Sequence, residues 1–273
     1  MSNGPIGVFD SGYGGLTVLK EITEKLPQYD YVYLGDNARA PYGPRSFETI
    51  YQYTLQCVEW FFAMGCPLVI IACNTASAKA LRTIQQNDLP QLGPDKRVLG
   101  VIRPTTEIIG NYTKSNQVGI LCTEGTVQSN SYPIEIAKFF PEIAVFQQAC
   151  PMWVPLIENN EHLSPGADYF IQKNIQQLLD QSPAIDTILL ACTHYPLLLE
   201  KLQQYVPAGT TLLSQGQIVA NSLGDYLANH AELAQQCTQN GRVSFFTTDS
   251  TEDFDRHGAI FYGKPIISTH LEL

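Results

Sequence analysis

The sequence has little charge, and few of its charges are positive. Charged residues make up 15% of the 273 residues, and 16 Lys and Arg stand against 26 Asp and Glu, which leaves a formal net charge of −10 at pH 7. Binding to nucleic-acid phosphates needs clustered Lys and Arg, so we expect no nucleic-acid partner. Hydrophobic residues make up 44% of the chain, which is enough to bury a core. A disordered chain is therefore excluded.

Long apolar runs and paired cysteines are also missing. The longest nearly apolar run covers residues 60–73, whereas a helix that crosses a bilayer needs about 20 residues. The first residues show no basic segment followed by an apolar one, as a secretory signal would. We therefore expect a cytoplasmic protein with no membrane partner. The seven cysteines are odd in number and form no Cys-x-x-Cys pair, which argues against a disulfide framework, a zinc ribbon and a thioredoxin-type site.

Short apolar runs alternate with longer amphipathic stretches, which is the pattern of an α/β protein with parallel strands. The runs predict strands at residues 6–9, 31–34, 68–72, 98–101, 118–121, 187–191, 211–213, 243–247 and 259–261. The stretches between them predict helices near residues 15–26, 46–63, 75–87, 105–112, 126–139, 167–181, 196–205, 216–230 and 251–257.

A faint internal repeat divides the chain into two halves of similar plan. Residues 6–12 align with residues 118–124, and residues 67–75 align with residues 186–194. In each aligned pair, an apolar strand is followed by polar residues at a turn. We expect two α/β domains, the first formed by residues 1–100 and 208–273 and the second by residues 101–207.

Two cysteines lie where a parallel sheet binds its ligands, outside the carboxyl ends of strands. Cys73 and Cys192 each end an apolar run and are followed by polar residues. Free cysteines are usually small buried hydrophobic residues, but the start of a loop favours a functional position. If the halves face each other, the two thiols approach one cleft from opposite sides. We interpret four other cysteines as core residues: Cys57, Cys66, Cys150 and Cys237.

Ionisable residues accompany both of these cysteines. His194 stands two residues after Cys192 and could exchange a proton with it, because a lone Cys-x-His has too few ligands for a zinc site. Glu158 could orient His194 or could be a solvated carboxylate. Asp10 precedes a glycine-rich turn and could either cap a helix or assist chemistry. That turn lacks the spacing of a nucleotide-binding loop, but its backbone N–H groups could hold a carboxylate.

A further loop follows the second predicted strand. It has the pattern Asp36-x-x-Arg39-x-Pro41-Tyr42-Gly43. Proline and glycine together indicate a turn. The same loop could also form a wall of the site, in which the backbone groups of Tyr42 and Gly43 contact a ligand.

Five motifs, taken in order, resemble the glutamate racemases. They run from residue 7 to about residue 200, and both cysteines lie within them, so the set is far more specific than any one motif. The motifs are Gly7-Val8-Phe9-Asp10-Ser11-Gly12-x-Gly14-Gly15-Leu16, Leu34-Gly35-Asp36-x-x-Arg39-x-Pro41-Tyr42-Gly43, Ala72-Cys73-Asn74-Thr75-Ala76-Ser77, Gly125-Thr126-Val127 and Ala191-Cys192-Thr193-His194-Tyr195-Pro196.

The resemblance implies two pseudo-symmetric α/β domains with mainly parallel sheets and an active site in the cleft between them. It also implies a homodimer that needs no cofactor and no metal, and that interconverts L- and D-glutamate, the latter for peptidoglycan. Cys73 would take the α-proton from D-glutamate with the help of Asp10, and Cys192 would take it from L-glutamate with the help of His194 and Glu158. The residues implied in substrate binding are Asp10, Ser11, Pro41, Tyr42, Gly43, Asn74, Thr75, Thr123, Thr126, Thr193 and His194.

Elementary chemistry agrees with this interpretation. Racemisation at Cα needs a base on one face of the carbon and an acid on the other, and two opposed thiols supply both. Three alternatives stay open: a racemase of another amino acid such as aspartate, a hydrolase or transferase that uses Cys192 with His194, and an inhibitor of a partner such as DNA gyrase. Two thiols in such motifs argue against a purely binding role.

Overall fold

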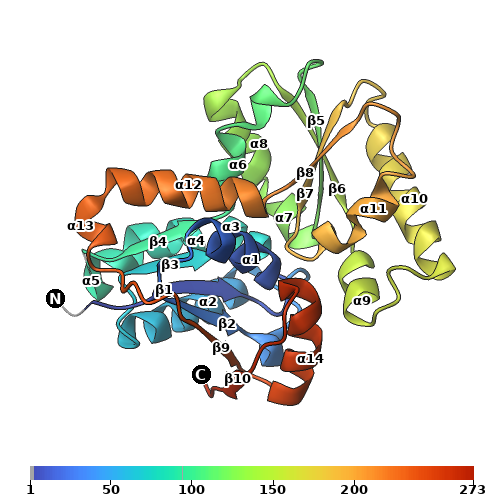
Figure 1. Cartoon of the computed structure of the whole chain (residues 1–273). Coiled ribbons are helices and arrows are strands. Elements are labelled where there is room, and N and C mark those ends of the chain that lie inside the picture. The colour runs from blue at the N-terminus through green and yellow to red at the C-terminus, as the bar shows by residue number, and fades with distance from the viewer. Residues whose placement is uncertain (1–2, 94) are drawn as a thin grey trace.

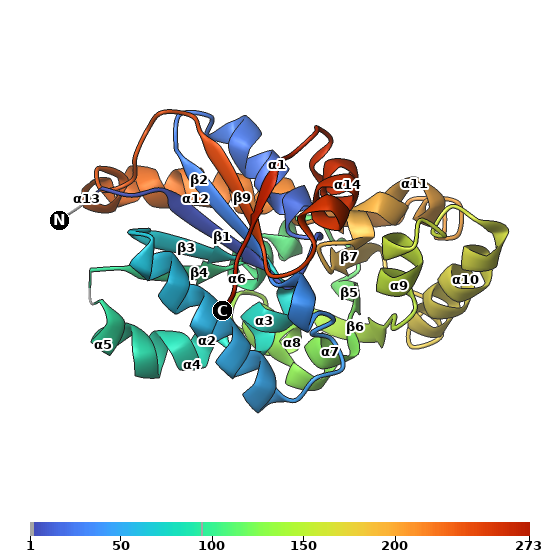
Figure 2. The same ribbon diagram turned by 90° about the horizontal axis from the view of Figure 1, so that it is seen from below.

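The computed structural model describes residues 3–93 and 95–273 of the chain. Within these residues the strands form two sheets, one of six strands and one of four, which lie side by side with helices around them (Figures 1 and 2). None of the helices in this part of the chain combines the length and the apolar character that crossing a bilayer requires.

The strands run parallel in both sheets. The larger sheet has the order β10-β9-β2-β1-β3-β4 and the smaller one the order β6-β5-β7-β8. The larger sheet contains β1 (Ile6–Asp10), β2 (Tyr31–Gly35), β3 (Leu68–Ile71), β4 (Arg97–Gly100), β9 (Val243–Thr247) and β10 (Ser268–His270). The smaller sheet contains β5 (Gln117–Cys122), β6 (Ala144–Ala149), β7 (Thr187–Ala191) and β8 (Thr211–Ser214).

The two sheets repeat one strand order, as the internal repeat predicted. The order β2-β1-β3-β4 in the larger sheet corresponds to β6-β5-β7-β8 in the smaller one, so that β5 takes the place of β1 and β7 takes that of β3. Every residue of β1, β2, β3 and β7 is buried. Parallel strands that are covered on both faces have such continuous apolar sequences, which is why these strands could be predicted.

Helices cover both faces of each sheet. The larger sheet has α1 (Leu16–Lys25), α12 (Gly216–Asn229) and α14 (Thr251–Tyr262) on one face and α2 (Phe47–Ala63), α3 (Asn74–Lys79) and α4 (Leu81–Thr83) on the other. The smaller sheet has α6 (Ile102–Thr106) and α8 (Ser131–Phe139) on one face and α9 (Trp153–Glu158), α10 (Pro165–Leu179) and α11 (Leu199–Leu202) on the other. The remaining α-helices of the described residues are α5 (Leu89–Leu92), α7 (Glu124–Ser129) and α13 (Ala231–Ala234).

The chain passes between the sheets twice. The first crossing follows β4 at Val101, and the second follows β8 at Gln215, after which α12 packs against α1 (Figure 1). β8 pairs with β7 in the smaller sheet. The expected return to the first domain at residue 208 is therefore too early, because residues 211–214 still belong to the smaller sheet.

One predicted strand is a helix in the structure, and two strands of the structure, β6 and β10, were not predicted. Residues 259–261, predicted as a strand, belong to α14, where Phe254, Gly258, Phe261 and Tyr262 are buried at the spacing of one helix face. Packing of that face decides the conformation of a short apolar run that fits either element. β6 starts within the apolar run 143–146 but continues into glutamines, and its residues are exposed or only partly buried, while β10 has only three residues.

Asp186, just before β7, holds the loop that leads into β5. Its carboxylate accepts hydrogen bonds from the Thr113 hydroxyl (2.6 Å) and from the backbone N–H groups of Lys114 (2.7 Å) and Ser115 (2.8 Å). Partial burial raises the pKa of this group, but the hydrogen bonds to its charged form outweigh burial and lower the pKa to about 2.

We expect Asp186→Asn to lower the free energy of unfolding by about 1–2 kcal/mol at pH 7, because hydrogen bonds to a charged acceptor are lost. The folded-state pKa lies below the ordinary value, so this stabilisation is present above about pH 4 and disappears as the pH falls toward 2. Urea unfolding at pH 7 and at pH 3 measures the change. Asp180→Asn, on an exposed carboxylate, is the control, and a deficit of Asp186→Asn that does not shrink in acid would contradict the assignment.

Candidate active site

The carboxyl ends of the central strands of the two sheets meet each other. Thr193, which follows β7, donates a hydrogen bond to Asp10 at the end of β1 (3.3 Å). Thr75, which follows β3, is hydrogen-bonded to Thr123, which follows β5 (2.9 Å). In each sheet these are the ends between which the strand order reverses, where open parallel sheets bind ligands. The two binding edges therefore form one shared site.

Cys73 joins the end of β3 to the start of α3. Its Sγ accepts a hydrogen bond from the N–H of Ala76 (3.4 Å) and lies 3.5 Å from the hydroxyl of Ser11, and its side chain is buried. Burial and then the charge of Asp10 raise the pKa of this thiol to about 11, although the hydrogen bonds from Ala76 and Ser11 act in the opposite direction. At neutral pH Cys73 is thus a thiol, and it must lose its proton before it can act as a base.

Cys192 occupies the corresponding place after β7 and has a different partner. Its Sγ lies 4.0 Å from His194 Nδ1, and His194 Nε2 lies 2.9 Å from Glu158 Oε1. A carboxylate only accepts hydrogen bonds, so Nε2 carries a hydrogen, and Nδ1 is the ring nitrogen that faces the thiol. Burial raises the pKa of Cys192 well above its ordinary value. The arrangement is a thiol with a general base that a carboxylate orients.

Asp10 is a buried carboxylate whose charge acts on both thiols. It is fully buried, and its carboxylate accepts hydrogen bonds from the N–H of Gly12 (3.0 Å) and from the Thr193 hydroxyl. Burial raises the pKa of Asp10. Electrostatic attraction to His194 and these hydrogen bonds offset part of that rise. The negative charge of Asp10 also raises the pKa of both Cys73 and Cys192.

A cluster of hydroxyl and amide groups completes the site. Thr123 caps α7 and is hydrogen-bonded to the hydroxyls of both Thr75 (2.9 Å) and Thr126 (3.1 Å). Asn74 is buried, and its side-chain nitrogen Nδ2 has no hydrogen-bond partner in the described part of the chain. Burying an amide donor without a partner costs free energy. The N–H₂ group of Asn74 is therefore suited to donate a hydrogen bond to a ligand. Together these donors fit a carboxylate.

The loop after β2 places Gly43 against the cluster and holds the Tyr42 side chain in a network of its own. The Tyr42 hydroxyl donates to Asp36 Oδ2, to which Arg39 Nε also donates (2.7 Å), so the Tyr42 ring is held in a buried network. Gly43 lies against Thr123, because a Cβ placed on it would be 3.3 Å from the Thr123 Cβ. Pro41 is exposed. Of the candidate residues, the structure thus leaves the side chain of Pro41 outside the cluster.

Two residues that the sequence analysis did not single out join the halves beside His194. The Thr17 hydroxyl lies 2.9 Å from the carbonyl oxygens of both Gly14 and Thr193. Gly14 has no room for a side chain, because a Cβ there would lie 2.2 Å from Thr193 Oγ1 and 2.4 Å from His194 Nδ1. The glycine-rich turn signalled a close approach, but its partner is distant in sequence and only the fold reveals it.

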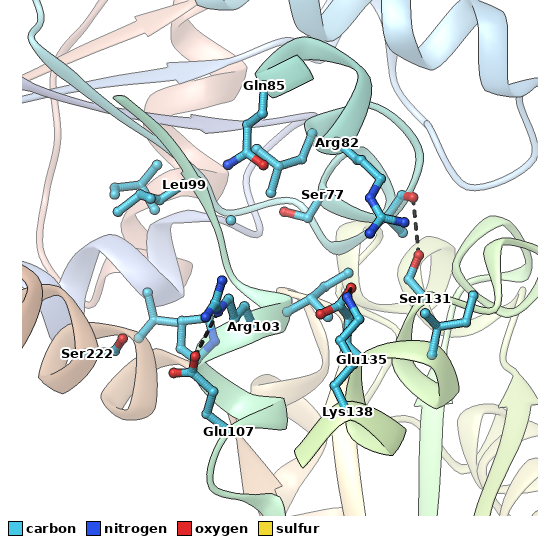
Figure 3. A pocket seen from close by; sticks show the side chains of 18 of the residues that line it. Ser77, Arg82, Gln85, Leu99, Arg103, Glu107, Ser131, Glu135, Lys138 and Ser222 are labelled. Carbon is cyan, nitrogen blue, oxygen red and sulfur yellow. Dashed lines mark hydrogen bonds and ion pairs between the residues drawn. The ribbon is translucent and has the colours of Figure 1, made fainter. Parts of the chain in front are cut away.

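A hollow of about 630 Å³ lies apart from this cluster (Figure 3). Residues of α3, α4, α6, α8 and α12 line it, and none of the candidate residues does. Arg103 is paired there with Glu107 (2.7 Å), and Lys138 is paired with Glu135. Across residues 3–93 and 95–273, no three His, Cys, Asp or Glu side chains are grouped as metal ligands would be. The chemistry-bearing groups therefore mark the strand ends as the candidate site.

Residues 6–223 match the Asp/Glu/Hydantoin racemase family, and the chain belongs to this family. Among its relatives, the glutamate racemase of Levilactobacillus brevis is 39% identical over 257 residues, which are 93% of this chain and 90% of that protein. The crystal structure of glutamate racemase isoform RacE1 from Bacillus anthracis matches with a TM-score of 0.90 and 31% identity, over 100% of this chain and 99% of that one. The glutamate racemase of Francisella tularensis, in complex with D-glutamate, has a TM-score of 0.88 and 30% identity, over 100% and 98%. The family that the motifs predicted and the expected α/β fold are confirmed.

Gly14→Ala should reduce racemase turnover at least about tenfold, because its Cβ must push His194 and Thr193 away from Cys192 and Asp10, and small displacements of positioned groups have effects of this size. Gly12→Ala is the matched control in the same turn, since its Cβ would meet nothing closer than 3.6 Å, and its turnover should stay within a few-fold of normal. Thermal melting checks that both variants fold. Equal activity of the two variants would show that the close approach at Gly14 does not matter.

Proposed function

We propose that this protein interconverts L- and D-glutamate by proton transfer at Cα between two thiols, without a cofactor. The observation that carries the proposal is the convergence of Cys73 and Cys192, one from each sheet, on one buried cluster in which His194 lies beside Cys192 and the charge of Asp10 acts on both thiols. The relatives named above are glutamate racemases, and one was solved with D-glutamate.

The proton transfers follow from this arrangement. With D-glutamate, the Cys73 thiolate takes the α-proton, so the C–H bond breaks, an S–H bond forms and the electron pair remains on the substrate. The Cys192 thiol then gives its proton to the opposite face of Cα and is left as a thiolate. L-glutamate reverses the roles. Asp10 would assist ionisation of Cys73 by accepting its proton, since the negative charge of Asp10 alone opposes the thiolate, and His194, oriented by Glu158, would accept the proton of Cys192 at Nδ1.

Donors around the substrate would stabilise the charge that develops in the transition state. When the α-proton leaves, negative charge spreads into the α-carboxylate, where preorganised donors in a closed site are most effective. The free amide of Asn74 and the hydroxyls of Thr75, Thr123 and Thr126 would supply these donors. The carboxylate of Asp10 and the hydroxyls of Ser11 and Thr193 would hold the ammonium group, and the backbone of Tyr42 and Gly43 would contact the substrate, with Pro41 shaping their loop.

We further propose that the protein works in the cytoplasm as a homodimer and supplies D-glutamate for peptidoglycan synthesis, which maintains cell shape. The net charge of −10 supports the absence of a nucleic-acid partner, and we propose no membrane partner. Analytical ultracentrifugation tests the dimer. Incubation of the purified protein with L-glutamate alone, followed by circular dichroism, tests the activity, and the same assay with L-aspartate tests its specificity.

Single replacements of the cysteines test the two-thiol mechanism. Cys73→Ser and Cys192→Ser should each reduce turnover in both directions by at least about a hundredfold, because one face of Cα then lacks its acid or base. Cys66→Ser and Cys237→Ser, at buried cysteines outside the cluster, should stay within a few-fold if they fold. Near-normal activity of Cys73→Ser together with a dead Cys192→Ser would favour the hydrolase-like alternative instead.

The fate of the proton separates two bases from one. In heavy water, the thiol that returns a hydrogen begins as S–D, because thiols exchange rapidly with solvent. D-glutamate formed early from L-glutamate should therefore carry deuterium at Cα, while the remaining L-glutamate keeps its protium. Mass spectrometry of the separated enantiomers at low conversion measures both. Substantial protium in the early product would mean that one base serves both faces, and the two-thiol mechanism would fail.

A further inference from the structure

A buried chain of hydrogen bonds leads from the crossings between the sheets to the candidate site. The side-chain Nε2 of Gln215 lies 3.0 Å from the carbonyl oxygen of Val101, 3.0 Å from the hydroxyl of Thr105 and 2.9 Å from the hydroxyl of Tyr132. The Tyr132 hydroxyl in turn donates to Oδ1 of Asn74 (2.5 Å). All five residues are buried, and Tyr132 is completely so.

The carbonyl of Val101 decides the direction of every bond in this chain. A carbonyl oxygen only accepts, so Gln215 must turn its N–H₂ group, and not its oxygen, toward Val101. The same nitrogen shares its two hydrogens among Val101, Thr105 and Tyr132 and cannot accept one, so the hydrogen of the Tyr132 hydroxyl is left to donate elsewhere. That hydrogen goes to Asn74, which must present Oδ1 to receive it.

The consequence appears at the site. With Oδ1 committed to Tyr132, the N–H₂ group of Asn74 is turned the other way, and this buried nitrogen has no hydrogen-bond partner among the residues that the structure describes. If the amide were reversed, Nδ2 would donate to Tyr132 and an oxygen would face the substrate. Two acceptors, an amide oxygen and a carboxylate, would then repel each other.

We propose that Tyr132 and Gln215 are positioning residues that hold the Asn74 amide with its N–H₂ group toward the substrate carboxylate. The inference rests on the proposed role of Asn74 in carboxylate binding. Because Val101 and Gln215 lie at the two crossings between the sheets, the bond that joins the crossings also sets the polarity of the site. In this proposal Tyr132 and Gln215 do not touch the substrate, and both act through Asn74.

A double-mutant cycle tests this dependence on Asn74. Tyr132→Phe removes the hydroxyl and keeps the ring, and it should lower kcat/KM for glutamate about five- to tenfold, the size of one net hydrogen bond. Asn74→Ala should lower kcat/KM at least about tenfold. In the Asn74→Ala background, Tyr132→Phe should have no further effect, because its only route to the substrate is gone. Gln215→Met, which keeps the volume but has no donor, should behave in the same way.

Tyr31→Phe is the matched control. Tyr31 is also a buried tyrosine whose hydroxyl donates one hydrogen bond, to the carbonyl of Leu26 (2.8 Å), but it lies in β2 away from the site. It should leave kcat/KM within twofold, and melting curves check that all the variants fold. Equal losses from Tyr132→Phe with and without Asn74, or no loss at all, would overturn the positioning role. Unchanged kcat/KM in Asn74→Ala would overturn the binding role of Asn74 itself, and the positioning role with it.

Discussion

A carboxylate that is removed from water has to be compensated, and Asp10 is compensated from both halves of the chain. Its side chain is fully buried. It accepts one hydrogen bond from the N–H of Gly12 in its own turn and another from Thr193, which follows β7 of the smaller sheet. Leaving such a group without partners would cost several kcal/mol. The contact with Thr193 therefore joins the two strand ends, and Gly14 packs closely against Thr193 and His194 beside it.

The repeat of one strand order places two equivalent loops face to face, but it does not make them chemically equal. Cys73 and Cys192 follow corresponding strands, β3 and β7. The first thiol has a hydroxyl and a helix N–H beside it, whereas the second has an imidazole that a carboxylate orients. A protein made of L-residues cannot be its own mirror image, so each face of a chiral substrate meets a different set of groups. Two-fold pseudo-symmetry supplies the opposed thiols, and local sequence supplies the help that each receives.

Much of the framework could be predicted from sequence, because buried parallel strands have continuous apolar runs. The strands that lead to Asp10, Cys73 and Cys192 were predicted within a residue or two for this reason. Prediction failed where burial is partial or where a run fits two elements. The edge strand β6 carries glutamines, and the apolar run at residues 259–261 lies in α14, whose buried residues Phe254 and Phe261 pack beside Tyr13 and His194. The domain boundary expected at residue 208 was too early. The pairing of β8 with β7, which places residues 211–214 in the smaller sheet, joins residues far apart in the sequence and leaves no local pattern.

The sequence by itself determined the α/β class, the repeat and the residue types that could carry proton transfer, because these depend on composition and on neighbours along the chain. Only the tertiary structure decided which groups face one another. The 4.0 Å approach of Cys192 to His194, the hydrogen bond of Thr193 to Asp10 and the orientation of the Asn74 amide through Tyr132 all join residues by direction and distance in space. A tyrosine in an amphipathic helix and a glutamine at the start of another have no sequence signal for such a role, since the polarity of their hydrogen bonds is set by the backbone carbonyl of Val101, which Gln215 meets only after folding.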